Sequence, residues 1–256
     1  MSTQNEKARA FHSMHKAGDP LVLFNVWDAG SAKAVAAAGA QAIATGSWSV
    51  AAANGFDDGE RIPLDLALAN LRRIVDATAL PVTIDLESGY GRTPEDVGRT
   101  LAAAIQAGAI GCNLEDSFPE TGKLRDPADQ VERLTRARAA ADSASIAVFI
   151  NARTDVFFQD PPAAHDAAMV DAALARAHAY AGAGADGLFV PGLADEALIA
   201  RVVKGSPLPV NIMVGPGTPP LARLAALGVA RVSHGPGPYL AAMESLRQAA
   251  EAAQRR

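Results

Sequence analysis

Residues 81–116 read PVTIDLESGYGRTPEDVGRTLAAAIQAGAIGCNLED. Two short apolar runs in this stretch, Val82–Asp85 and Ile110–Glu115, flank the longer amphipathic segment Thr93–Ala107. The segment opens with Thr-Pro-Glu-Asp, in which the threonine is a favourable N-cap and the proline stands at the first helical position. Acidic residues in the first turn also suit the helix dipole. The stretch therefore predicts a strand, a helix and a second strand, with both strands buried on both faces.

The same alternation of apolar runs and helical segments continues along the whole chain. Two later helices are expected to open at Asp126–Pro127 and Thr218–Pro219, by the same signals. Eight strand–helix units in 256 residues suit a (β/α)8 TIM barrel, an α/β fold. The eight predicted strands are Leu21–Phe24, Ala42–Thr45, Val82–Asp85, Ile110–Glu115, Val148–Asn151, Gly187–Val190, Val210–Val214 and Ala230–Ser233.

No linker or change of composition divides the chain, so we expect a single domain over residues 1–256. Residues 1–18 are predicted to hold an N-terminal helix and residues 238–256 a C-terminal helix. A doubly wound open sheet is the competing fold. The barrel is favoured over it because no Gly-x-Gly-x-x-Gly turn follows the first strand.

Composition narrows the function classes. The net charge is −5 without a basic cluster, which argues against nucleic acid or an acidic membrane as the main partner. The single cysteine cannot form an intrachain disulfide, and a reducing cytoplasm fits that usage. No apolar run reaches the length of a signal-peptide core or a membrane span. We therefore expect a soluble cytoplasmic protein.

Polar residues follow most of the predicted strands, at the end of a barrel where catalytic residues gather. Asp85, Glu87 and Glu115 end two adjacent strands and would repel each other unless a cation intervened. Oxygen ligands of this kind suit Mg²⁺ or Mn²⁺. Arg153 follows the next strand and offers a planar fork for a substrate carboxylate. Gly46 would let backbone amides approach an anion.

Each of these residues also has a simpler interpretation. A single acid at a strand end is more often a helix cap than a ligand, and the run Asp57–Glu60 has the composition of a solvated turn. His234 could be a polar residue at the barrel rim, and Cys112 is expected in the core. The other histidines are predicted to lie on the surface, namely His12, His15, His165 and His178.

Several motifs together resemble the isocitrate lyase/phosphoenolpyruvate mutase superfamily. The acid-x-acid-x-Gly-Tyr-Gly stretch is the most specific of them, and the resemblance keeps the order of the motifs over nearly the whole chain. The motifs are Asn25-Val26-Trp27-Asp28-Ala29, Thr45-Gly46-Ser47, Gly55-Phe56-Asp57-Asp58, Asp85-Leu86-Glu87-Ser88-Gly89-Tyr90-Gly91, Asn113-Leu114-Glu115-Asp116 and Asn151-Ala152-Arg153-Thr154-Asp155.

The resemblance implies a barrel enzyme, often a tetramer (a dimer of dimers) whose subunits exchange a C-terminal helix, here Pro238–Arg256. It implies Mg²⁺ near Asp85, Glu87 and Glu115, held partly through water. The carboxylate of a small 2-oxo acid would lie against Thr45, Gly46, Ser47 and Arg153. Asp58 matches a position that takes part in the chemistry, and Asn211 one that contacts substrate in the lyase branch.

The sequence departs from the named branches at two places. The loop Ser117–Asp126 lacks the Cys and His of the isocitrate and methylisocitrate lyases and the Asn of the mutases, and Pro191 replaces the family's His or Glu. We therefore expect a Mg²⁺-dependent lyase or hydrolase that cleaves a C–C bond next to a 2-oxo acid through an enolate, with an oxaloacetate-like or methylisocitrate-like substrate. The alternatives are a phosphonopyruvate hydrolase or phosphonomutase, and a 2-oxo acid-binding barrel with little catalysis.

Overall fold

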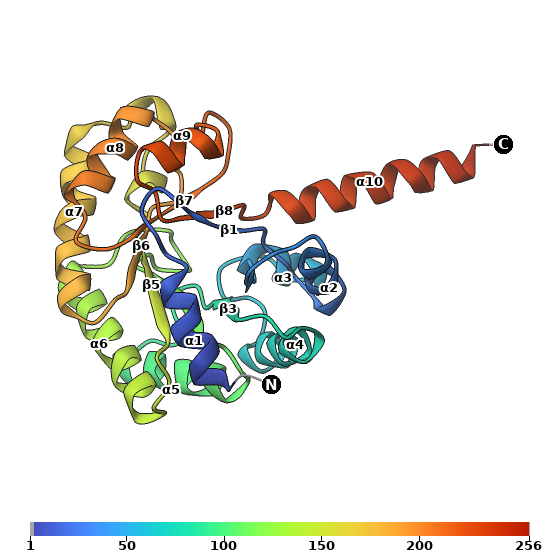
Figure 1. Ribbon diagram of the computed structural model, residues 1–256, viewed down its shortest axis with the longest axis horizontal. Coiled ribbons are helices and arrows are strands. Elements are labelled where there is room, and N and C mark those ends of the chain that lie inside the picture. The colour runs from blue at the N-terminus through green and yellow to red at the C-terminus, as the bar shows by residue number, and fades with distance from the viewer. Residues whose placement is uncertain (1–2, 256) are drawn as a thin grey trace.

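The computed structural model describes residues 3–255, which form a ring of parallel strands surrounded by helices (Figure 1). All eight predicted strands are present, most of them a residue or two shorter than expected. They are β1 (Leu21–Leu23), β2 (Ile43–Ala44), β3 (Val82–Asp85), β4 (Gly111–Glu115), β5 (Phe149–Arg153), β6 (Gly187–Phe189), β7 (Val210–Met213) and β8 (Arg231–Ser233).

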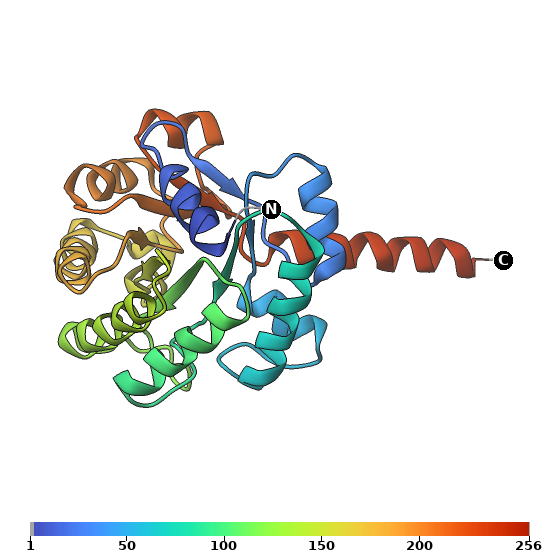
Figure 2. The same ribbon diagram turned by 60° about the horizontal axis from the view of Figure 1, so that its bottom comes forward.

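The helices alternate with these strands and cover the outside of the ring, except for the last helix, which points away from it (Figure 2). They are α1 (Gln4–Ser13), α2 (Ala29–Ala37), α3 (Ser47–Ala53), α4 (Leu64–Ala77), α5 (Pro94–Gln106), α6 (Pro127–Ser143), the short 3-10 helices η1 (Val156–Phe158) and η2 (Pro162–Ala164), α7 (Ala167–Gly182), α8 (Glu196–Gly205), α9 (Leu221–Ala226) and α10 (Gly237–Gln254).

The strands follow one another around the sheet in the order β1-β8-β7-β6-β5-β4-β3-β2. Between β1 and β2 the ring is joined by a bridge, in which the Val26 amide donates to the Ala44 carbonyl at 2.9 Å and the Gly46 amide to the Val26 carbonyl at 3.2 Å. A doubly wound sheet would reverse its strand order at a switch point. The barrel prediction is therefore confirmed.

Two of the three helix starts predicted from capping signals are correct. The Thr93 hydroxyl accepts a hydrogen bond from the Asp96 amide at 3.2 Å, and Asp96 reciprocates with the Thr93 amide at 2.9 Å, a complete capping box. Asp126 caps α6 through the Ala128 amide at 2.8 Å. The start predicted at Thr218 is wrong, because that hydroxyl accepts from the Gly215 amide within the preceding turn and α9 begins at Leu221.

α1 is shorter than the helix predicted within residues 1–18, whereas α10 begins one residue before the predicted Pro238. α1 ends at Ser13, and a turn containing Gly18, whose φ is +83°, leads into β1. Residues 1–2 and 256 lie outside the described range. In residues 3–255, no helix has the length and apolar character that crossing a membrane requires.

The prediction that His15 lies on the surface is wrong. Its ring stacks on Phe149 with centroids 3.9 Å apart, and its Nδ1 donates to the Phe11 carbonyl at 2.8 Å. Burial, followed by the nearby positive charge of Arg231, lowers the pKa of His15 to about 3. His15 is therefore a neutral, partly buried residue packed on Phe149. Cys112 is fully buried, as predicted.

This histidine should make the free energy of unfolding depend on pH. Between pH 6.5 and 3 the unfolded chain binds a proton that the folded chain excludes, so stability falls as pH falls through that window. From pH 7 to 5 the contribution is about 2 kcal/mol. His15→Phe keeps an aromatic ring and should remove that loss in urea unfolding at the two pH values. An unchanged pH dependence, equal to that of the exposed control His178→Phe, would contradict the assignment.

Candidate active site

The carboxyl ends of the barrel strands enclose a cavity of about 190 Å³. This is smaller than the roughly 300–1,000 Å³ of sites for drug-sized ligands, so it suits a small metabolite. Residues from all eight strands, or from the loops that follow them, reach its wall together with the start of α3. The lining residues are Asn25, Gly46, Ser47, Trp48, Asp58, Asp85, Asn113, Arg153, Phe158, Phe189, Pro191, Met213, Ser233, Gly235 and Pro236.

Asp85, the last residue of β3, lies in the cavity wall beside α3. Its Oδ2 accepts hydrogen bonds from the Ser47 hydroxyl at 3.1 Å and, more weakly, from the Ser47 amide at 3.4 Å. The Asp85 amide donates to the Thr45 hydroxyl at 3.0 Å. Thr45 does not line the cavity. It holds the backbone of Asp85 in place, and Gly46 and Ser47 line the wall next to it.

Glu87 is buried behind Asp85 and is held by the loop that carries Asp58. The Glu60 amide donates to its Oε2 at 2.6 Å, and the Tyr90 hydroxyl to its Oε1 at 3.2 Å. Glu60 and Glu87 both have positive φ angles, 59° and 50°, which non-glycine residues adopt only when their surroundings enforce them. Burial raises the pKa of Glu87 to about 8, and the negative charges of Asp58 and Asp85 add to the rise.

Arg153, the last residue of β5, is fixed by two buried carboxylates. Its Nη1 contacts the Glu115 Oε2 at 2.9 Å, and its Nε and Nη2 donate to the two Asp155 oxygens at 2.6 and 3.0 Å. The Ser117 hydroxyl lies 2.8 Å from both acids. Burial alone would lower the pKa of Arg153, but Glu115 and Asp155 outweigh it and raise that pKa. The guanidinium is therefore a permanent, oriented cation in the cavity wall.

Asp58 lies at the mouth of the cavity, in the loop before α4. Partial loss of hydration raises its pKa, and the charge of Asp85 raises it further, although Arg153 opposes the shift. A Cβ on the next residue, Gly59, would lie 3.2 Å from the Pro119 carbonyl oxygen. The Asp58 turn thus packs closely on the loop of residues 117–126, which folds back on itself through a bridge between Ser117 and Leu124.

Asn211 lies below the cavity in a buried amide layer. Its Oδ1 accepts from the Asn151 Nδ2 at 3.1 Å, and its own Nδ2 donates to the Ser233 hydroxyl at 3.1 Å. The other Asn151 contact is to the Asn113 Oδ1 at 2.9 Å. Asn113 and Ser233 line the cavity floor, whereas Asn211 supports them from beneath.

A second buried network supports Arg153 from the side of α7. The Asp116 Oδ1 accepts from the amide of Asp155, at 2.9 Å. Its Oδ2 accepts from Arg176 at 2.9 Å and from the Tyr180 hydroxyl at 2.7 Å. The carboxylate that orients Arg153 is thus anchored through Asp116 to the outer ring of helices.

Five predicted site residues therefore meet in the cavity wall: Gly46, Ser47, Asp58, Asp85 and Arg153. Thr45, Glu87, Glu115 and Asn211 lie behind it. Within residues 3–255, no set of three or more His, Cys, Asp or Glu side chains is arranged to enclose a metal ion. The three acids predicted to hold a metal thus form no cage, because each one already has a different partner.

Comparisons with known proteins identify the family to which this chain belongs. The family model for phosphoenolpyruvate phosphomutase matches residues 11–254. 2-Methylisocitrate lyase of Escherichia coli is 31% identical over 250 residues, covering 95% of this chain and 81% of that protein. A crystal structure from Burkholderia cenocepacia J2315, provisionally assigned as a phosphonomutase, is 61% identical with a TM-score of 0.96, covering 98% of this chain and all of that one.

A phosphonopyruvate hydrolase solved with oxalate and Mg²⁺ has a TM-score of 0.82 over 96% of this chain and 85% of its own, at 23% identity, which shows a shared fold. The family match spans almost the whole barrel and includes the motifs at its rim that resemble the superfamily. The chain thus belongs to the phosphoenolpyruvate phosphomutase family and is an enzyme of the isocitrate lyase/phosphoenolpyruvate mutase superfamily of carbon–carbon lyases and mutases.

Proposed function

We propose that the chain is a Mg²⁺- or Mn²⁺-dependent lyase that cleaves a carbon–carbon bond at the carbon next to the carbonyl of a small 2-oxo acid. The observation that carries this proposal is the position of Asp58, Asp85 and Arg153 around one small cavity at the barrel mouth. In the reaction the C3–C4 bond breaks and its electron pair remains on C3 as an enolate. C4 leaves as carbon dioxide when it is a carboxylate, or as the carbonyl carbon of an aldehyde or ketone when it carries a hydroxyl group that loses its proton. A proton then returns to C3.

The donor set at Asp85 fits a divalent ion that keeps much of its water. Mg²⁺ is commonly bound by one or two carboxylates, with water and substrate completing the octahedron, so it needs no protein cage. Asp85 would hold the ion, and Glu87 and Glu115 would act through water. A bound ion there would supply Lewis-acid stabilisation of the charge that develops on the carbonyl oxygen.

The protein's own groups account for the other requirements. Arg153 has five N–H donors, three of which contact Glu115 and Asp155, so two are left for a substrate carboxylate. Gly46 and Ser47 would line the carboxylate's other side. The raised pKa of Asp58 suits a group that returns a proton to C3. The loop of residues 117–126, packed on the Asp58 turn, would act as the lid that excludes water.

Oxalate mimics the enolate and tests the proposal without knowledge of the substrate. We expect titration calorimetry to detect oxalate binding only when Mg²⁺ is present, and a screen that includes oxaloacetate and 2-methylisocitrate to detect metal-dependent release of a 2-oxo acid product. The proposal fails if oxalate does not bind in the presence of the metal and no product release in the screen depends on it.

A phosphonopyruvate hydrolase or phosphonomutase is the second candidate, and the 61% identical Burkholderia structure is the observation in its favour. Pro191 stands where the mutase branch carries His, and the loop of residues 117–126 lacks the Asn of that branch, which makes this candidate second. Metal-dependent phosphate release from phosphonopyruvate would place it first.

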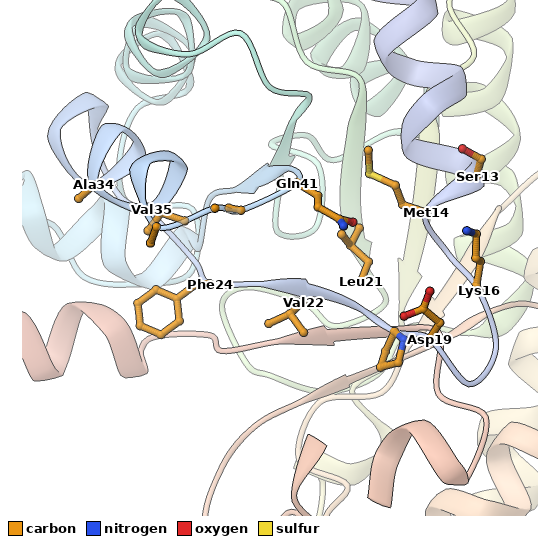
Figure 3. Close-up of a pocket in the computed structure, with 14 residues that line it drawn as sticks. Ser13, Met14, Lys16, Asp19, Leu21, Val22, Phe24, Ala34, Val35 and Gln41 are labelled. Carbon is orange, nitrogen blue, oxygen red and sulfur yellow. The ribbon is translucent and has the colours of Figure 1, made fainter. Parts of the chain in front are cut away.

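We also propose that α10 packs on a second copy of the chain, within a dimer of dimers. It extends away from its own barrel (Figure 1), and Ala242, Met243, Leu246, Ala249 and Ala250 recur at helical spacing along it. A groove of about 800 Å³ lies open outside the barrel between β1 and α2 (Figure 3), where Val22 and Phe24 remain exposed. The α10 helix of a neighbouring copy, packed in this groove, would cover its own apolar residues as well as Val22 and Phe24.

Leu246→Asp should therefore lower the oligomeric state measured by sedimentation. Burying a carboxylate in an apolar interface is strongly unfavourable, so the exchanged helix would be released. Leu66→Asp, which changes another exposed leucine, on α4, is the control and should leave the mass unchanged. A monomeric parent protein, or an unaltered mass for Leu246→Asp, would argue against the exchange.

A further inference from the structure

The wall of the active-site cavity has two chemically different halves. The half built by β1 to β5 and the loops that follow them carries polar groups, among them Asn25, Asp58, Asp85 and Arg153. The half that follows β6 and β7, together with η1, carries only Phe158, Phe189, Pro191 and Met213, and Trp48 and Pro236 complete the mouth. A ligand held by the polar half must therefore place its remaining atoms against apolar side chains.

The charges of the lining residues also favour a ligand with a single carboxylate. The lining contains two carboxylates, Asp58 and Asp85, and its only cation within the described residues is Arg153. Arg153 also contacts Glu115 and Asp155, so its two remaining N–H groups, together with a bound divalent ion, would meet one carboxylate of a 2-oxo acid. A second carboxylate on the ligand would have no cation to pair with, and an unpaired buried charge is strongly unfavourable.

The aromatic residues at the mouth leave much of their surface open to water. Phe158 is 49% exposed and Trp48 is 37% exposed, although both belong to the cavity wall. The Arg153 guanidinium lies 5.6 Å from the Phe158 ring centroid and 5.9 Å from that of Phe189. An apolar group that extends from a carboxylate on Arg153 would thus meet these rings directly and remove their surface from water.

We propose that the substrate is a monocarboxylic 4-hydroxy-2-oxo acid whose C4 carries an uncharged aliphatic or aromatic group packed against the ends of β6 and β7 and leaves with that group as an aldehyde or ketone. This inference rests on the proposed function. It separates the chain from enzymes whose substrates carry a second carboxylate or a phosphonate at that position.

Two ligands of the same shape test the inference by calorimetry in the presence of Mg²⁺. 2-Oxoglutarate ends in a carboxylate, and in 5-methyl-2-oxohexanoate two methyl groups replace the two oxygens of that carboxylate. We expect the methyl ligand to bind at least tenfold more tightly. Equal or tighter binding of 2-oxoglutarate would overturn the inference, and so would binding of oxalate without binding of the methyl ligand.

A charge placed on the apolar half should reverse the preference. Phe158→Arg supplies the missing cation and should shift the ratio of the two dissociation constants at least tenfold towards 2-oxoglutarate. Leu66→Arg makes the same change in charge on α4, away from the cavity, and should leave the ratio unchanged. An unchanged ratio in Phe158→Arg would contradict the inference, whereas failure of oxalate to bind with Mg²⁺ would identify the proposed function itself as the error.

Discussion

Replacement of Asp85 by alanine is expected to reduce metal-dependent kcat/KM about 1,000-fold. A divalent ion contributes several kcal/mol to the stabilisation of a developing enolate, and each 1.36 kcal/mol corresponds to a factor of ten in rate. Asp85 is the carboxylate in the cavity wall that would hold that ion, so its loss should remove most of this stabilisation. Steady-state kinetics with the best substrate from the 2-oxo acid screen measures the effect.

Folding stability separates this role from a structural one. Asp85 raises the pKa of both Asp58 and Glu87, which means that it repels them in the folded protein. Removing it should leave the midpoint of thermal unfolding unchanged or raise it, while Mn²⁺ binding followed by electron paramagnetic resonance is lost. Asp57→Ala, in the same turn as Asp58 but outside the cavity, should change none of the three measurements. A large fall in the unfolding midpoint of Asp85→Ala would indicate a structural carboxylate instead.

Replacement of Arg176 by methionine should give the largest loss of stability, about 3–5 kcal/mol. The change leaves the carboxylate of Asp116 fully buried without its ion-pair partner, and breaking a buried pair on one side costs about that much. For a domain of this size we expect the unfolding midpoint to fall by roughly 10 °C. Calorimetry or circular dichroism of the purified variant measures it.

The double variant Asp116→Asn, Arg176→Met is the test of mechanism. It removes the stranded charge and should recover part of the lost stability. Arg201→Met breaks an exposed pair with Asp171 and should cost less than about 1 kcal/mol. Equal losses of stability in Arg201→Met and Arg176→Met would show that the buried network contributes no more to stability than an exposed ion pair.

The barrel and much of the cavity wall could be predicted because both follow from local patterns. Apolar runs that alternate with capped helices identify the strands, and the topology then brings the strand ends together, so the residue that ends each run is a candidate. Asp85 and Arg153 were identified on this basis, and both line the cavity.

The supporting contacts could not be predicted, because they join segments distant in the sequence. Glu60 has the composition of a solvated turn, and only the fold brings its amide within 2.6 Å of Glu87, 27 residues away. Asp116 and Arg176 are 60 residues apart and lie on different elements. His15 was placed on the surface because nothing in the helix pattern reveals that Phe149 lies over it.

The first turn of α10 lies beside the wall of the cavity. Tyr239 stands edge-on to Trp27 and Trp48, with centroids 5.2 and 5.9 Å apart, and Trp48 is part of the cavity wall. If α10 packs on a neighbouring subunit, the orientation of the Trp48 ring depends on that contact. Dilution should then cost specific activity before any barrel unfolds, and concentrating the sample should restore it.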